Sequence, residues 1–189
     1  MGKKYKELSN RHIEFINNKK LYFVGTAVGE GNVNVSPKGG DTLRVIDSNT
    51  IVWLNLTGSG NETAAHVLKN PRMTIMFCAF EGPPLILRAY GNTKVLHQND
   101  REWSEYINLF PQNPGFRQIF ILNINLVQAS CGMGVPYYNY AGDREDLTKW
   151  SDKKGAEGIE KYRIDKNQES IDGFETEIVK RSGISCIFD

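Results

Sequence analysis

The sequence is poor in residues that bind metals or form disulfides. It has three cysteines, at positions 78, 131 and 186, and no C-x-x-C pair, so we expect neither a disulfide framework nor a zinc site. The three histidines, at positions 12, 66 and 97, are far apart and lack the spacing of metal ligands. We therefore expect no metal, and thiols that stay reduced as in a cytoplasmic protein.

The sequence also lacks an excess of charge and a long apolar run. Its 23 Lys and Arg residues balance 22 Asp and Glu residues, which gives no electrostatic reason to expect nucleic acid or an anionic membrane as a partner. No apolar stretch approaches the roughly 20 residues of a membrane-spanning helix. Residues 1–16 are charged throughout and do not have the pattern of a secretory signal. We expect a cytoplasmic protein without membrane contact.

What the sequence does contain is a series of apolar segments of strand length. The chain has 189 residues, of which 40% are hydrophobic, and this suffices for the core of one domain. Strands are predicted at residues 21–27, 33–36, 43–46, 51–56, 73–80, 85–95 and 116–126, the last extendable through 127–130. No helical pattern interrupts residues 21–56, which favours an antiparallel barrel over a doubly wound parallel sheet.

Helical patterns fall between some of these strands and after the last one. They cover residues 5–18, 62–69, 99–108 and 143–162. The polar residues that follow contain three apolar side chains that could dock on the barrel: Ile171, Phe174 and Ile178. We predict a mainly β fold with helices (a β-barrel of the α+β class), divided into a barrel domain, residues 1–140, and a helical C-terminal extension, residues 141–189, packed on it.

The first segment with chemical potential is the end of the strand at 33–36. Pro37 is expected to end or bulge that strand, which frees neighbouring backbone groups for another partner. Lys38 supplies a positive charge suited to phosphate, and Gly39 lets a ligand approach the backbone. A plain turn explains the same residues.

The second segment is a glycine-rich loop between a strand and a helix. It consists of Thr57, Gly58, Ser59, Gly60 and Asn61. Such loops expose N–H groups, and the N-terminus of the following helix attracts anions. No Gly-Lys-Ser/Thr follows, so the loop is not a Walker A motif. The alternative is an ordinary loop in which Asn61 caps the helix.

The third segment follows the last strand. It contains Cys131, Gly132, Met133, Gly134 and Val135, and its glycines predict a backbone packed closely on something. The tyrosines that follow could stack on a flat ring or simply pack in an interface. For Cys131 we favour a buried, inert thiol.

Two arginines, Arg44 and Arg88, lie within apolar strands. They either reach a buried anion or face solvent.

Together these segments resemble the pyridoxamine 5'-phosphate oxidase-like, FMN-binding split-barrel family. The resemblance is carried by SPKGG (36–40), TGSGNE (57–62), NPRMTIMF (70–77) and SCGMGVP (130–136), in that order, and covers most of residues 20–140. It implies a six-stranded antiparallel split barrel and a homodimer with two FMN molecules at its interface. In the family pattern, Val35, Ser36, Pro37, Lys38 and Gly39 match the strand that lines the flavin. Thr57, Ser59, Gly60 and Asn61 match the loop that reaches its phosphate, and residues 132–136 match a segment that approaches the flavin from the other subunit.

The resemblance implies an FMN-dependent oxidoreductase that uses NAD(P)H or another small donor. The sequence lacks the C-terminal Arg-x-x-Trp element of true pyridoxamine 5'-phosphate oxidases and ends in CIFD (186–189), so we do not expect activity on pyridoxamine 5'-phosphate. No catalytic residue is nominated, because the flavin performs the electron transfer. Two alternatives stay open: a flavin- or heme-binding module without robust turnover, and an enzyme that uses a deazaflavin.

Overall fold

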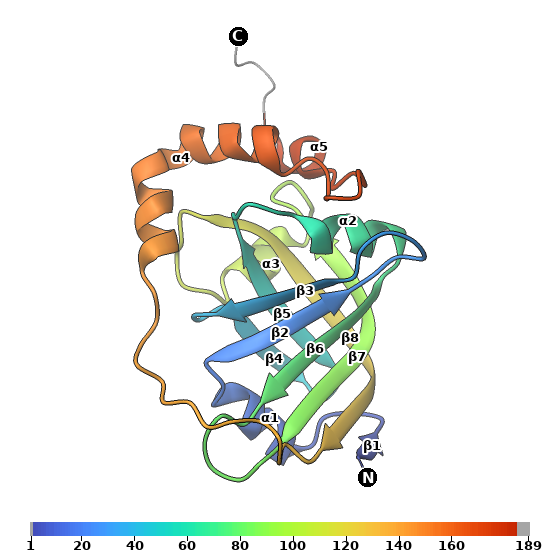
Figure 1. Ribbon diagram of the computed structural model, residues 1–189. Coiled ribbons are helices and arrows are strands. Elements are labelled where there is room, and N and C mark those ends of the chain that lie inside the picture. The colour runs from blue at the N-terminus through green and yellow to red at the C-terminus, as the bar shows by residue number, and fades with distance from the viewer. Residues whose placement is uncertain (1, 185–189) are drawn as a thin grey trace.

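The protein is a curled antiparallel sheet with helices at its ends (Figure 1). The computed structural model describes residues 2–184. The CIFD segment (186–189), used above in the expectation about pyridoxamine 5'-phosphate, lies outside the described residues. The strands are β1 (Lys3–Tyr5), β2 (Leu21–Thr26), β3 (Asn34–Gly39), β4 (Leu43–Asp47), β5 (Thr50–Leu56), β6 (Arg72–Cys78), β7 (Ile86–Leu96) and β8 (Phe116–Ser130). The helices are α1 (Asn10–Asn17), α2 (Glu62–Lys69), α3 (Trp103–Ile107), α4 (Asp146–Lys166) and α5 (Ile178–Ser182).

The sheet runs in the order β3-β2-β6-β7-β8-β5-β4, and β1 pairs with β8. The sheet thus has eight strands, where the sequence pattern predicted seven segments and the family resemblance implied six. The inner face of the sheet holds the main core, in which Trp53 stacks on Phe120 with ring centroids 4.4 Å apart, and Phe77 packs nearby. A second cluster fills the space between α3 and the opposite face of β5 and β8. The prediction that residues 21–56 form strands of an antiparallel sheet with no helix between them is confirmed.

Pro37 neither ends nor bulges its strand, so that prediction was wrong. β3 continues through Pro37 to Gly39, and Pro37 pairs with Phe23 of β2. Because β3 is an end strand of the sheet, the missing N–H of the proline costs no ladder hydrogen bond on its open side. The residues that flank Pro37 are therefore held in regular extended geometry.

The first helix begins later than predicted. Ser9 caps α1 by accepting a hydrogen bond from the His12 amide (3.3 Å), while the His12 ring accepts one from the Ser9 amide (3.2 Å). Residues 3–5 instead pair with the end of β8. The third helix is also shorter than predicted, whereas α2 and the extension of β8 through Ser130 are confirmed.

The C-terminal extension crosses the barrel beside α2 (Figure 1). α4 is kinked at Gly155, which has a φ of 67°. Of the predicted docking side chains, Ile178 is buried, Phe174 is half-buried, and Ile171 is 79% exposed, so the prediction for Ile171 was wrong. Among residues 2–184, no helix combines the length and apolar character that crossing a membrane requires.

Candidate functional site

A cavity of about 330 Å³ lies between β3 and the loop at residues 57–61. Its lining brings together Ser36, Pro37 and Lys38 from the first predicted segment with Gly58, Ser59, Gly60 and Asn61 from the second. Asn55 of β5 and Arg117 of β8 complete the polar wall. Two segments about 20 residues apart in the sequence thus form one polar cavity, while Thr57 is fully buried beneath the loop.

Lys38 is the first of two cations at this cavity. It is half-buried, and its Nζ lies 5.6 Å from the centre of the Trp53 ring. Burial, with a smaller contribution from the charge of Arg117, lowers the pKa of Lys38 to about 8. The ammonium group is therefore held where its charge is poorly solvated.

Arg117 is the second cation, and no sequence argument nominated it. It is 2% exposed, and it donates to Asn167 Oδ1 (2.6 Å) and to the Gly60 carbonyl (3.0 Å). Burial and the nearby charge of Arg163 lower the pKa of Arg117 to about 9. The reasoning that selected Arg44 and Arg88, a charge within an apolar strand, would also have selected Arg117.

Neither cation is neutralised by the protein. Among residues 2–184, neither Lys38 nor Arg117 forms a salt bridge, and Arg117 Nε has no hydrogen-bond partner. The acidic residue in the cavity lining, Glu62, accepts hydrogen bonds from the Ile171 amide at 3.0 and 3.2 Å. Buried charges are costly unless they are paired, so the arrangement is suited to a bound anion.

The loop at 57–61 is held through its oxygens. The Gly58 carbonyl accepts from Asn167 Nδ2 (3.0 Å), and Thr57 Oγ1 accepts from Arg163 Nε (3.1 Å). In the described part of the chain, the amides of Gly58, Ser59 and Gly60 donate to no protein acceptor. These N–H groups stay available for a ligand.

Asn61 does not cap α2 with its side chain, so that alternative was wrong. It occupies the N-cap position but makes no side-chain capping bond, and its Nδ2 donates to the Asn167 carbonyl (3.1 Å). This contact to a residue 106 positions away fixes the direction of the carboxamide, and among residues 2–184 its Oδ1 accepts no hydrogen bond, from the helix or elsewhere.

Ser36 is fixed by a chain of side-chain hydrogen bonds that leads from the cavity into the core. Its Oγ donates to Asn34 Oδ1 (3.1 Å), and Asn34 Nδ2 donates to Thr26 Oγ1 (3.2 Å). Thr26 Oγ1 in turn lies 3.2 Å from Nδ1 of the buried His66. The chain holds the Ser36 hydroxyl in a defined orientation at the cavity wall.

The other predicted residues lie elsewhere. Arg44 forms an ion pair with Asp41 and donates to the Leu109 carbonyl (2.9 Å), and the hydrogen bond from Arg44 lowers the pKa of Asp41. It does not line the cavity. Arg88 donates to Ser130 Oγ (3.0 Å). Val35 and Gly39 lie on β3 but do not line the cavity, and Val35 is 63% exposed.

The third segment is also separate from this cavity within one chain. Gly132 is packed against Leu85, just before β7, since a Cβ there would lie 2.8 Å from the Leu85 amide nitrogen. Met133 is 82% exposed, and Gly134 and Val135 lie beside it on the surface. Cys131 is exposed, which contradicts the buried thiol that we favoured, because the chain leaves the barrel at this point.

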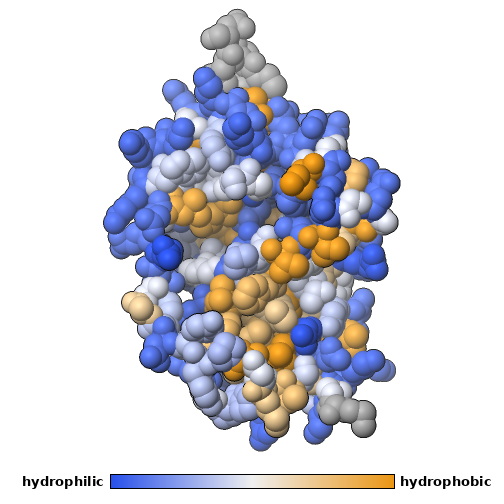
Figure 2. All heavy atoms as spheres, viewed as in Figure 1, coloured by the Kyte–Doolittle hydropathy of each residue, from blue (hydrophilic) through white to orange (hydrophobic). Residues whose placement is uncertain are grey.

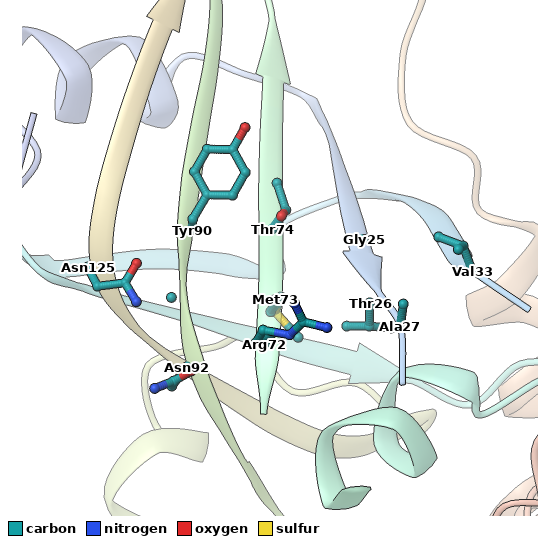
Figure 3. A pocket seen from close by; sticks show the side chains of 11 residues that line it. Gly25, Thr26, Ala27, Val33, Arg72, Met73, Thr74, Tyr90, Asn92 and Asn125 are labelled. Atoms are coloured by element: carbon teal, nitrogen blue, oxygen red, sulfur yellow. The ribbon is translucent and has the colours of Figure 1, made fainter. Parts of the chain in front are cut away.

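A second cavity, of about 470 Å³, lies on the outer face of the sheet (Figure 3). Tyr90 and Thr74 point from β7 and β6 toward it, with Arg72 at its lower end and Val33 beside it. No sequence pattern marked these residues. The space-filling view shows apolar side chains gathered over the same region of β2 and β3 (Figure 2).

A family model described as "Pyridoxamine 5'-phosphate oxidase" matches residues 8–131. The chain belongs to this family. A curated relative, the pyridoxamine 5'-phosphate oxidase family protein ustO of Aspergillus flavus, is 32% identical over 187 residues, which cover 89% of this chain and 75% of the relative.

Solved structures of low sequence identity share the split-barrel fold. A HupZ variant from Group A Streptococcus is 18% identical, with a TM-score of 0.52 over 65% of this chain and 98% of that chain. A Lactobacillus delbrueckii protein named for pyridoxamine 5'-phosphate oxidase is also 18% identical, with a TM-score of 0.51 over 65% and 94% of the two chains. The predicted split-barrel fold is therefore confirmed.

Proposed function

We propose that the protein binds FMN, with the flavin phosphate in the cavity between β3 and residues 57–61. One observation carries the proposal: Lys38 and Arg117 are two poorly solvated cations without a salt bridge among residues 2–184. A phosphate would neutralise both, and charge-assisted hydrogen bonds are the strong ones. The free amides of Gly58, Ser59 and Gly60 add neutral donors for its remaining oxygens.

FMN is the phosphorylated ligand that the family membership favours. The regular extended geometry of β3 supports an aromatic ring system lying along Val35, Ser36 and Pro37, next to the phosphate site. The hydrogen-bond chain behind Ser36 would keep its hydroxyl fixed toward such a ligand.

We propose further that the protein is an FMN-dependent oxidoreductase that uses NAD(P)H or another small donor on an unidentified small molecule. When bound, the flavin would supply hydride or electron transfer. The chain's own residues would anchor the phosphate, orient the flavin ring along β3 and exclude water from one face of that ring. No side chain is assigned as a general acid or base.

The test is an absorbance spectrum of the purified, dialysed protein before and after addition of FMN, followed by anaerobic NADPH. We expect flavin bands that stay with the protein on gel filtration and bleach with the donor. A flavin spectrum that stays oxidised with every donor would leave binding without the proposed oxidoreductase activity. Protein that elutes free of FMN at all concentrations would refute the binding proposal.

We also propose that the active form is a homodimer that covers the outer face of the sheet. Val33, which lines the outer cavity, is 72% exposed, and Val35 and Met133 are 63% and 82% exposed. Burying these apolar side chains against a second copy is favourable. Sedimentation velocity should give twice the 21.4 kDa mass of the chain, and Val33→Lys should shift it toward the monomer. Monomeric wild-type protein at micromolar concentration would contradict this.

A further inference from the structure

The C-terminal extension is interlocked with the candidate phosphate cavity through Asn167. This residue follows α4, is fully buried, and uses every polar group it has. Its side chain accepts from Arg117 (2.6 Å) and donates to the Gly58 carbonyl (3.0 Å). Its carbonyl accepts from Asn61 Nδ2 (3.1 Å) and from Thr176 Oγ1 (2.6 Å).

Neighbouring residues of the extension hold the same region. Arg163 donates to Thr57 Oγ1 (3.1 Å) and to the Phe116 carbonyl (2.6 Å). The Asp172 carboxylate accepts from the Asn32 amide (2.8 Å) and the Asn32 side chain (2.7 Å), next to the start of β3. The extension thus contacts the strand side and the loop side of the cavity without lining it.

We propose that Asn167 is a positioning residue for the phosphate site, an inference that rests on the proposed function. Across a trans peptide the C=O and the next N–H point in opposite directions. By binding the Gly58 carbonyl, Asn167 turns the Ser59 N–H away from the extension and toward the cavity. By binding Arg117, it fixes the guanidinium whose Nε is left without a partner among residues 2–184.

The neutral amide is essential to this role. A carboxylate at the same position could still accept from Arg117, but it would pair with the guanidinium and cancel the charge that a phosphate requires. It could not donate to the Gly58 carbonyl. The carboxamide orients both groups while leaving the positive charge available to the ligand.

The test compares Asn167→Asp with Thr176→Val, measuring dissociation constants for FMN and riboflavin, which lacks the phosphate. Both variants remove one hydrogen bond made by or to Asn167, but only the first alters the contacts to Arg117 and Gly58. We expect Asn167→Asp to weaken FMN binding by about tenfold or more while changing riboflavin binding by less than about twofold. Thr176→Val, which can lower thermal stability, should keep the FMN-to-riboflavin ratio of the wild type.

Two results would overturn the positioning role. One is an Asn167→Asp variant that keeps the wild-type ratio. The other is an equal fall of the FMN-to-riboflavin affinity ratio in both variants, which would mean that Asn167 acts only by stabilising the fold. Wild-type protein that binds FMN no better than riboflavin would instead refute the proposed phosphate site itself.

Discussion

Lys38→Met should weaken FMN binding by about a hundredfold and also raise the stability of the ligand-free protein. The first effect follows because the substitution removes one of the two cations at the phosphate site while keeping the apolar stem over Trp53. The second follows because the folded protein holds the Lys38 ammonium where burial lowers its pKa to about 8. Equilibrium binding and urea unfolding measure the two effects.

The pH dependence of this gain has a definite sign. The folded state binds the Lys38 proton more weakly than the unfolded state, whose pKa is 10.5, so charged Lys38 destabilises the fold below pH 8. The full shift corresponds to about 3 kcal/mol, reduced by solvent because the side chain is only half-buried. The stability gain of Lys38→Met should therefore be present at pH 7 and vanish near pH 10.5. A gain that is the same at both pH values, or a stability loss at pH 7, would contradict the assigned cause.

Gly91→Ala should lower the free energy of unfolding by about 3–5 kcal/mol. Gly91 lies in β7 at a register shift against β8, where Tyr90 pairs with Leu126 and Gly91 with Ile124. A Cβ there would overlap the Asn123 carbonyl oxygen and lie 2.8 Å from its carbon. These are backbone atoms of the neighbouring strand, so they can move only if the pairing opens.

Gly25→Ala is the matched control. Gly25 is also a strand glycine, in β2, but a Cβ there would meet Thr74 at ordinary contact distances of 3.8 and 3.9 Å. We expect a change of less than about 1 kcal/mol in urea unfolding of this variant. Similar losses in the two variants would mean that the intrinsic strand propensity of alanine against glycine, not the close approach at Gly91, sets the effect.

The sequence was sufficient for features that depend on local patterns. Short apolar segments located β2 to β8 but not β1, and the glycine loop with its following apolar-faced helix located α2. Pro37 misled because the expected effect of a proline depends on whether its strand is central or at the end of the sheet, and strand order is a tertiary property.

The contacts that could not be predicted are those made across the fold. Arg117 meets Asn167 across 50 positions, and Asn61 meets the same residue across 106. Such pairs leave no periodic signal in one sequence. Arg44 misled for a different reason: its apolar strand suggested a buried anion, although a local partner, Asp41, lies only three residues away.

The most direct test of the account is a crystal structure of the protein with FMN bound. We predict that the phosphate lies within hydrogen-bond distance of Lys38 Nζ, the Arg117 guanidinium and the Ser59 amide, with the ring system along β3. FMN seated with its phosphate away from Lys38 and Arg117, for example in the outer cavity near Arg72, would contradict the assignment of the site.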